Sequence, residues 1–384
     1  MEWLDFLAWP VLAMSLAGSA YLVCASVAVW SATRRPLPHL RTPQPASLLK
    51  PLHGADSQLY ENLLSFCHQD HPVFQIVFGV VDADDPAIPV VRRVMAEFPA
   101  LDLTLVVGGS ARAPNRKVQN LQNMLPEAKH PILVISDADM RVTPIYLATV
   151  TAPLSDDHVG LVTCLYRGVS AGGFWSKLAC LYVNHGFFSQ AAVGAALDMG
   201  TFGATLALTR ATLETSGGLA ALADQLADDN ALGEAVRHLG KRVVVSSLIV
   251  DTMIWEPSLM ALFKHELRWA RTLRLVAPEG YIASVVTHPV VLGLLAWILT
   301  LVAGEPFWAF WTLVMAFLAR WATFRLDDRL LGLNPTPLYL IPPRDLLSFV
   351  VFIASFFTRH VAWRDRRLRI GRDGRLTLDG DRPA

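Results

Sequence analysis

The chain has 384 residues, of which 53% are hydrophobic and 17% are charged, and its mean hydropathy is +0.38. These values are too apolar for an ordinary soluble enzyme and indicate one large domain together with membrane segments. The 33 basic and 33 acidic residues cancel, so overall charge gives no reason to expect a nucleic-acid partner. Four cysteines without C-x-x-C spacing argue against a disulfide framework and a zinc site: Cys24, Cys67, Cys164 and Cys180.

A transmembrane helix is predicted within residues 1–33. Residues 9–30 carry no charge, and this run is long enough to cross a bilayer. A cleaved signal peptide is the alternative, but the basic residues follow the run instead of preceding it. Arg34, Arg35 and Arg41 favour a cytoplasmic location for what comes next. Residues 34–45 are rich in proline and read as an extended linker.

Residues 46–257 show the alternation typical of an α/β domain. Apolar strand candidates lie at 46–52, 75–81, 101–107 and 132–135, with helix candidates at 56–68, 87–98 and 115–125 between them. Further strands are expected at 161–166 and 242–250, and further helices at 174–196 and 219–238. This order predicts a mostly parallel sheet flanked by helices.

Acidic residues follow two of these strands. Asp137 and Asp139 come directly after strand 132–135, so both carboxylates leave its carboxyl end, where ligands bind in open α/β sheets. Two carboxylates this close favour a divalent cation between them. A turn with helix-capping acids explains the tripeptide equally well by itself. The segment 82–85 places a second group of aspartates after strand 75–81.

The remaining sequence predicts an interfacial helix, membrane segments and a basic tail. Residues 258–281 contain an amphipathic helix with four basic residues near one face. Apolar runs at 285–303, 307–318 and 346–357 lie within a membrane region of residues 282–358, and arginines concentrate in the tail 359–384. If all three runs crossed, this tail would lie outside the cell. We therefore expect that one late run does not cross, or that 325–342 hides another broken segment.

Six short motifs occur in order between residues 48 and 275. They are Leu49-Lys50-Pro51-Leu52-His53-Gly54, Asp84-Asp85-Pro86-Ala87-Ile88, Asn115-x-Lys117-Val118-x-Asn120, Ser136-Asp137-Ala138-Asp139, Ala227-Asp228-Asp229 and His265-x-x-Arg268-Trp269. With these motifs the chain resembles family 2 inverting glycosyltransferases, most closely the ceramide glucosyltransferase group. His265 stands where that group has Gln or Arg. The tail segment 363–374 is similar to bacterial hopanoid biosynthesis-associated glycosyltransferases.

The resemblance implies a GT-A-like (Rossmann-type) fold and a role for each motif. Nucleotide-sugar binding falls to Lys50, Pro51, Asp85, Asn115, Lys117, Asp137 and His265, with Asp85 at the uracil or ribose. Asp137 and Asp139 would hold Mg²⁺ or Mn²⁺ against the diphosphate. Asp229 would be the general base, with a pKa raised by its neighbour Asp228. Arg268 and Trp269 would close the site.

Structural readings stand beside several of these roles. For Arg268 and Trp269 the alternative is an interfacial basic helix that contacts lipid headgroups. Asp85 could instead cap the helix after Pro86, and Asp229 could belong to a solvated helix face with Asp224. His185, within the apolar stretch 174–196, is assigned to the acceptor site, although a hydrogen-bonded structural histidine explains it better.

Together these features predict a membrane-bound enzyme that transfers glucose or N-acetylglucosamine from a UDP-sugar to the hydroxyl of ceramide or a hopanoid. The alternatives are a processive polysaccharide synthase and a non-catalytic membrane scaffold or transport protein. We expect an integral protein of the bacterial inner membrane with its catalytic domain on the cytoplasmic side. Neither a nucleic-acid partner nor an obligate protein partner is expected.

Overall fold

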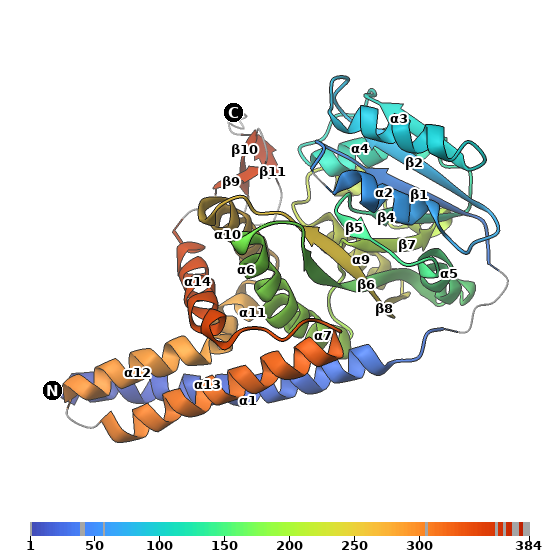
Figure 1. Ribbon diagram of the computed structural model, residues 1–384. Coiled ribbons are helices and arrows are strands. Elements are labelled where there is room, and N and C mark those ends of the chain that lie inside the picture. The colour runs from blue at the N-terminus through green and yellow to red at the C-terminus, as the bar shows by residue number, and fades with distance from the viewer. Residues whose placement is uncertain are drawn as a thin grey trace. The chain divides into compact units, whose positions relative to one another are not determined.

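The computed structural model describes residues 2–38, 43–56, 58–303, 306–357, 360–363, 366–370 and 376–378 (Figure 1). The chain divides into two compact units. The helical unit comprises Met1–Arg34, Lys177–Ala196 and Glu256–Arg359, and the sheet unit comprises Arg35–Ser176, Leu197–Trp255 and His360–Ala384. The segment Lys177–Ala196 therefore joins the helical unit, although its flanking residues belong to the sheet unit.

The sheet unit is built on an eight-stranded mixed sheet with the order β3-β2-β1-β4-β7-β6-β8-β5. β1 pairs in parallel with β2 and β4, β2 with β3, and β6 with β8, whereas β7 is antiparallel to both of its neighbours. The strands are β1 Ala46–Pro51, β2 Phe74–Val80, β3 Asp102–Val107, β4 Ile132–Ser136, β5 Met140–Arg141, β6 Val159–Ser170, β7 Thr205–Thr209 and β8 Arg242–Ile254. A separate three-stranded antiparallel sheet contains β9 His360–Trp363, β10 Arg366–Ile370 and β11 Leu376–Leu378.

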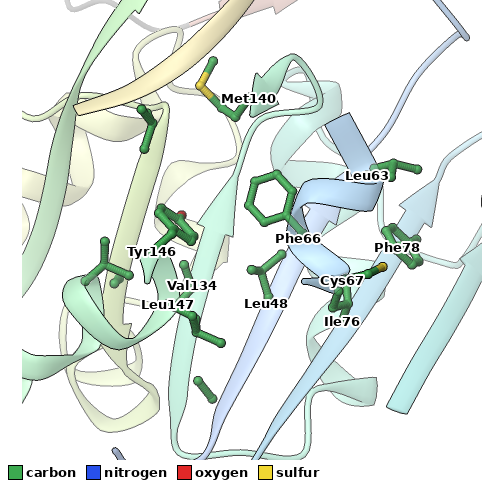
Figure 2. Packing of buried hydrophobic residues seen from close by; sticks show 14 of the residues in the cluster. Leu48, Leu63, Phe66, Cys67, Ile76, Phe78, Val134, Met140, Tyr146 and Leu147 are labelled. Carbon is green, nitrogen blue, oxygen red and sulfur yellow. The ribbon is translucent and has the colours of Figure 1, made fainter. Parts of the chain in front are cut away.

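Helices of the sheet unit cover both faces of the large sheet. They are α2 Leu59–Cys67, α3 Ala87–Glu97, α4 Arg116–Met124, α5 Tyr146–Thr151, α8 Arg210–Thr215 and α9 Asp228–His238. Leu48 and Val134 belong to one apolar core, part of which Figure 2 shows, and their neighbours Leu49 and Leu133 belong to a second core. Successive side chains of a strand point to opposite faces, so β1 and β4 are buried on both sides. The prediction of a fully buried strand at 132–135 is confirmed.

The predicted helix at 219–238 is wrong in its first half. Residues Leu219–Leu222 form a 3-10 turn, and the α-helix α9 begins only at Asp228. The carbonyl groups of Ala223 and Gln225 accept hydrogen bonds from the backbone and the side chain of Asn115, at 3.0 and 2.9 Å. Because these carbonyls bond to Asn115, they do not continue a helical ladder. Asp228 and Asp229 consequently lie in the first turn of α9.

The helical unit contains three long helices that pack side by side (Figure 1). They are α1 Glu2–Arg34, α12 Pro289–Ala303 and α13 Pro306–Leu330. The contacts are close because small residues line them: a Cβ on Gly18 would lie 2.0 Å from the carbonyl oxygen of Val286. The hydroxyl of Ser15 donates to the carbonyl of Pro289 at 2.8 Å, which ties α1 to the start of α12.

Shorter helices complete this unit. They are the α6–η3–α7 segment (Phe174–Tyr182, Val183–Phe187, Phe188–Ala196), α10 Leu259–Val276, α11 Pro278–Ala283, η5 Ser284–Thr287 and α14 Ile341–Ala354. The prediction of a helical segment at 174–196 is confirmed, with one π-helical turn, η3, in its middle. α6 starts in the sheet unit and continues into the helical unit.

Within the part of the chain that the structure describes, two helices are long and apolar enough to cross a membrane, Leu7–Arg34 and Phe307–Leu330. The pair Pro278–Thr287 and Pro289–Val302, bent by 66°, would form a third span. α14 has 14 residues and is too short to be counted as such a helix. This agrees with the expectation that one late apolar run does not cross the membrane. Residues 304–305, between two of the predicted apolar runs, and tail arginines such as Arg359 and Arg372 lie outside the described residues.

Candidate active site

Asp137 and Asp139 leave the sheet where β4 ends and β5 begins. Lys117 Nζ lies 2.7 Å from Asp137 Oδ1, and the Thr252 hydroxyl donates to Asp139 Oδ2 at 2.8 Å. The Asp137 side chain is 35% exposed. Burial and then the charge of Asp137 raise the pKa of Asp139. The carboxylates of Asp137 and Asp139 therefore repel each other, as expected from their spacing, and a cation between them would relieve the repulsion.

Lys117 brings the motif around Asp137 together with the Asp228-Asp229 motif. Its ammonium group lies 3.6 Å from Asp228 Oδ2 in addition to its contact with Asp137. Burial opposes the charged form of Lys117, but the carboxylates of Asp137 and Asp228 raise its pKa. Asn115 fixes the start of α4, because its side chain accepts from the Lys117 and Val118 N–H groups at 3.0 and 3.2 Å. Three motifs that lie far apart in the sequence thus meet.

Asp229 has one carboxylate oxygen that is not used by the protein. Oδ1 accepts from the Asn230 N–H at 2.8 Å, whereas Oδ2 has no hydrogen-bond partner within the part of the chain that the structure describes. Gly203 flanks this oxygen: a Cβ there would lie 3.1 Å from Asp229 Oδ2. Burial and next the charge of Asp228 raise the pKa of Asp229 to about 6, against the opposing charge of Lys117. The carboxylate is thus basic yet still ionised at neutral pH, as a general base requires.

Lys50 supports the Asp137 turn from inside the protein. It is fully buried, and its Nζ donates to the backbone carbonyl of Asp137 and lies 3.5 Å from the Ser136 hydroxyl. The same ammonium group lies 3.8 Å from the centroid of the Phe66 ring. Burial lowers the pKa of Lys50 to about 7. Its neighbour Pro51 ends β1 and is half-buried.

Asp85 ties the loop after β1 to the start of α3. Its carboxylate accepts from the Gly54 N–H at 2.9 Å and from the Ala87 N–H at 2.8 Å, and His53 Nδ1 lies 3.3 Å away. Gly54 has φ +74°, a conformation that favours glycine. The bond from the Ala87 N–H fits the structural alternative for Asp85, and its contact with the nucleotide stays a prediction.

His53, Asp82 and Asp85 form the group of three metal-ligand types that lie within 4.8 Å of one another in the described residues. Two of its carboxylates already have partners: Asp82 pairs with Arg116 at 2.5 Å, and Asp85 accepts backbone N–H groups. The Asp137 and Asp139 pair suits a divalent ion better, because Mg²⁺ commonly takes one or two carboxylates and completes its shell with phosphate and water. Sequence reasoning missed Arg116, although it lies inside the Asn115 motif.

The motif His265-x-x-Arg268-Trp269 lies on α10, in the helical unit. His265 Nδ1 is 2.6 Å from Glu256 Oε1, and the His265 ring meets the Trp269 ring edge-on with centroids 5.0 Å apart. The ring centroids of Trp269 and Tyr182 are 6.3 Å apart. Sequence reasoning missed Glu256, because nothing in its local pattern marks it as a partner of His265. The Glu256 carboxylate is thus placed to hold the His265 ring through Nδ1.

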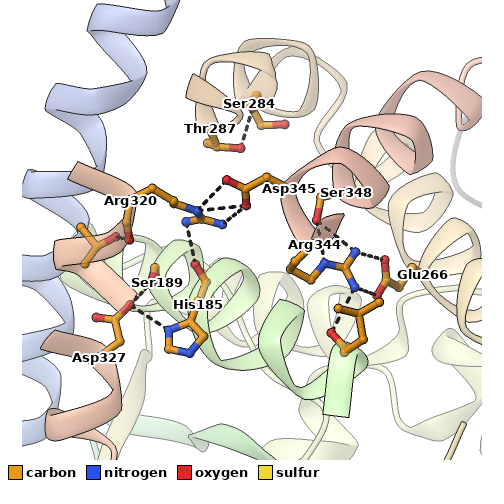
Figure 3. Close-up of polar contacts among 12 residues, drawn as sticks. His185, Ser189, Glu266, Ser284, Thr287, Arg320, Asp327, Arg344, Asp345 and Ser348 are labelled. Carbon is orange, nitrogen blue, oxygen red and sulfur yellow. Dashed lines mark hydrogen bonds and ion pairs between the residues drawn. The ribbon is translucent and has the colours of Figure 1, made fainter. Parts of the chain in front are cut away.

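His185 is buried inside the helical unit on η3 (Figure 3). Its Nε2 lies 3.1 Å from Asp328 Oδ1, its Nδ1 lies 3.7 Å from Asp327 Oδ2, and its ring stacks on Phe324 at 3.9 Å. The backbone carbonyl of His185 accepts from Arg320 at 3.1 Å. These contacts match the structural reading of His185, and its assignment to the acceptor stays a prediction.

Comparison with known proteins decides the family. The profile of glycosyl transferase family 21 matches residues 10–376, nearly the whole chain. The chain belongs to glycosyl transferase family 21. Membership in family 21 confirms the predicted enzyme class, a sugar-nucleotide-dependent glycosyltransferase, and the resemblance to ceramide glucosyltransferases, with 21 as the family number in place of 2.

Two similar relatives come from Caenorhabditis elegans. Ceramide glucosyltransferase 3 is 28% identical over 206 residues, which is 52% of this chain and 44% of that protein. Ceramide glucosyltransferase 1 is 23% identical over 342 residues, 86% of this chain and 72% of that protein. The alignment with the first of these family 21 relatives thus spans less than half of its length.

A solved structure confirms the fold of this family 21 chain. The mannosyltransferase from Pyrobaculum calidifontis, in complex with GDP-Man and Mn²⁺, aligns with a TM-score of 0.52 at 19% identity. The alignment covers 90% of this chain and 99% of that one. At this identity the likeness speaks to the fold, and it confirms the predicted GT-A-like sheet with flanking and membrane-type helices.

Proposed function

We propose that the protein transfers one sugar, glucose or N-acetylglucosamine, from a UDP-sugar to a hydroxyl of a membrane lipid with inversion. The observation that carries this proposal is the cluster in which Lys117 bridges Asp137 and Asp228 and Asp229 keeps Oδ2 free. Such a cluster offers a place for a diphosphate and a separate base for an incoming hydroxyl. The similarity to two ceramide glucosyltransferases favours glucose and ceramide.

Asp137 and Asp139 are the residues that would hold Mg²⁺ or Mn²⁺. The mutual repulsion of their carboxylates and the exposure of Asp137 fit this role. The bound ion would neutralise charge that develops on the leaving UDP diphosphate. Lys50 and Lys117 hold the turn in place through the backbone and the side chain of Asp137.

Asp229 removes the proton from the attacking lipid hydroxyl. The lipid oxygen forms a bond to the anomeric carbon while the bond from that carbon to the UDP oxygen breaks. The attack from the face opposite the diphosphate inverts the anomeric configuration. Asp228 contributes by keeping the pKa of Asp229 raised, after the larger effect of burial.

The roles of Asp85, His265, Arg268 and Trp269 rest on their motifs. Asp85 shapes the loop at the end of β1, and direct contact with uracil is proposed for it. His265, Arg268 and Trp269 are proposed to act in sugar transfer, with the Glu256 carboxylate orienting His265. We also propose that the protein is integral to the inner membrane with its sheet unit in the cytoplasm, as Arg34 and Arg35 after the first span favour.

The decisive experiment combines the purified protein with ceramide and, separately, UDP-glucose, UDP-N-acetylglucosamine and GDP-mannose. We expect stoichiometric UDP release and a lipid carrying one sugar, identified by mass spectrometry. A growing polymer would favour the processive synthase, and the absence of any glycolipid would contradict the proposal. The same assay with a hopanoid as acceptor tests the narrower resemblance of residues 363–374.

A further inference from the structure

A cavity of about 180 Å³ lies inside the helical unit, apart from the carboxylate cluster of the sheet unit. Residues of α7, α10, α11, η5 and α14 line it, among them Gln190, Glu266, Tyr281, His288, Ser348 and Phe352. The volume is several times the roughly 30 Å³ that one water molecule occupies in the liquid. The cavity can therefore hold the head of a lipid, but not a whole lipid.

A buried ion pair lies beside the cavity. Arg344 is fully buried and donates to both carboxylate oxygens of Glu266, at 2.8 and 2.7 Å (Figure 3). Arg344 also donates to the Ser348 hydroxyl oxygen at 3.2 and 3.1 Å. Because this oxygen accepts from Arg344, the Ser348 hydroxyl keeps its own hydrogen for another partner. No lysine or arginine is among the residues that line the cavity.

Two further polar side chains in the lining have no partner. The Gln190 amide and the His288 ring nitrogens make no hydrogen bond to the described part of the chain. The His288 ring contacts two other rings, Phe349 and Phe352, with centroids 5.5 and 5.6 Å away. Polar groups in apolar surroundings are costly unless they are hydrogen-bonded, so these two side chains favour a bound group with donors and acceptors.

The backbone around the cavity is interrupted at His288. The chain bends by 66° between Pro278–Thr287 and Pro289–Val302, and Pro289 cannot continue the hydrogen-bond ladder. Broken helices in membrane proteins are tolerated where they line a cavity, and such breaks commonly carry ligand sites. The bend therefore supports a binding role for this place.

The rim of the cavity is apolar and exposed. Leu273 lines the cavity and is 37% exposed, and Val276 and Ile282 on neighbouring turns are also exposed. A ligand with a polar head and hydrocarbon chains suits this combination, because its chains can cover the rim while its head reaches the polar groups. A purely soluble ligand would leave the rim uncovered.

We propose that this cavity binds an uncharged polar group of the acceptor lipid, with Gln190 and His288 as specificity-determining residues. The proposal rests on the proposed function, because it names the site of its acceptor. An amide or a second hydroxyl satisfies the donors and acceptors of Gln190, His288 and Ser348. The lining residues themselves include no Lys or Arg to pair with a phosphate. The cavity shares α10 with His265, Arg268 and Trp269, which links it to the motif.

The test uses the full chain in phosphatidylcholine nanodiscs and a ceramide that carries a diazirine next to its amide. We expect photo-crosslinks to peptides from α7, α11 or α14, and we expect unlabelled ceramide, but not phosphatidic acid, to compete. Crosslinks elsewhere would overturn the proposal. Equal competition by phosphatidic acid would also overturn it, because it would identify a site for structural lipid.

Two substitutions test the specificity residues. Gln190→Leu and His288→Phe keep the shape of each side chain and remove its polar atoms, so the KM for ceramide should rise about tenfold while the KM for the sugar nucleotide stays unchanged. The matched control is Thr300→Val on α12, whose hydroxyl bonds only within its own helix. An unchanged ceramide KM in both variants would contradict the proposal.

A variant that fills the cavity distinguishes loss of lipid binding from misfolding. A Cβ on Gly280 would meet only Ala277 Cβ, at 4.0 Å, so Gly280→Leu has room to place its side chain in the cavity. This variant should keep sugar-nucleotide binding and lose the crosslink. If the unmodified protein glycosylates no lipid at all, the proposed function fails, and the crosslink still reports separately whether the cavity binds ceramide.

Discussion

At the scale of single residues, Asp229 combines a raised pKa with a carboxylate oxygen that lies next to Gly203. Asp229→Asn keeps the shape and removes the base, so we expect sugar transfer to fall by about 10² to 10⁴-fold. Binding of the sugar nucleotide, measured by calorimetry, should be retained. Asp224→Asn, in the turn before α9, is the matched control. Full turnover by Asp229→Asn would show that another group is the base.

The pH dependence follows from the pKa of Asp229, which burial and then Asp228 raise to about 6. A general base works when deprotonated, so activity should be constant above this value and fall as the pH decreases through about 6. Asp228→Asn removes the neighbouring negative charge and should shift the acidic limb of the kcat profile to lower pH. A limb that stays in place or moves to higher pH would contradict the role of Asp228.

The sequence predicted residues of this site only where a short local motif marks them. Asp137 and Asp139 follow a run of buried aliphatic residues, and that local pattern indicates the end of a parallel strand. The pairing of Glu256 with His265 and the placement of Phe66 under Lys50 depend on the folded chain. No spacing rule connects Lys50 to Phe66, so these contacts could not be predicted.

At the scale of secondary-structure elements, the alternation of strands and helices predicted most of the sheet unit. It failed at β7 and at the start of α9. β7 is a five-residue strand inside a long apolar stretch, where periodicity does not separate strand from helix. The start of α9 is set by hydrogen bonds from Asn115, more than a hundred residues earlier in the chain. Both errors reflect tertiary contacts that override local preference.

The helices of the helical unit are joined by buried ion pairs, and in the pair of Arg344 on α14 with Glu266 on α10 the side chains are only 1% and 6% exposed. Arg344→Met leaves the Glu266 carboxylate buried and unpaired, which should cost about 3 to 5 kcal/mol of stability. A thermal unfolding curve in detergent measures this change.

Two further variants test whether that loss of stability comes from the unpaired buried charge. Arg344→Met combined with Glu266→Met should recover much of the stability, because no charge then stays buried. Arg93→Met, which breaks the exposed pair with Glu97, should have little effect. Equal losses from Arg344→Met and Arg93→Met would mean that burial does not govern the strength of these pairs.

At the scale of the whole molecule, the proposed reaction depends on a divalent ion as well as on the protein. Chelation with EDTA should stop sugar transfer, and added Mn²⁺ or Mg²⁺ should restore it, because Asp137 and Asp139 otherwise repel each other and the diphosphate. Lipid products counted by mass spectrometry measure the effect. Undiminished transfer in EDTA, after exhaustive dialysis, would exclude the metal assignment.

The division into two units has a consequence for how the protein is made. The chain passes between the units after Arg34, Ser176, Ala196, Trp255 and Arg359, and the Ser15 hydroxyl bonds to a carbonyl 274 residues further on. At 5 to 20 residues per second, α1 leaves the ribosome on the order of 15 to 55 s before α12. During this interval α1 is without its contacts to α12 and α13. The hydroxyls of Ser19 and Ser26 donate to backbone carbonyls of α1 itself, so these two groups need no partner from later parts of the chain.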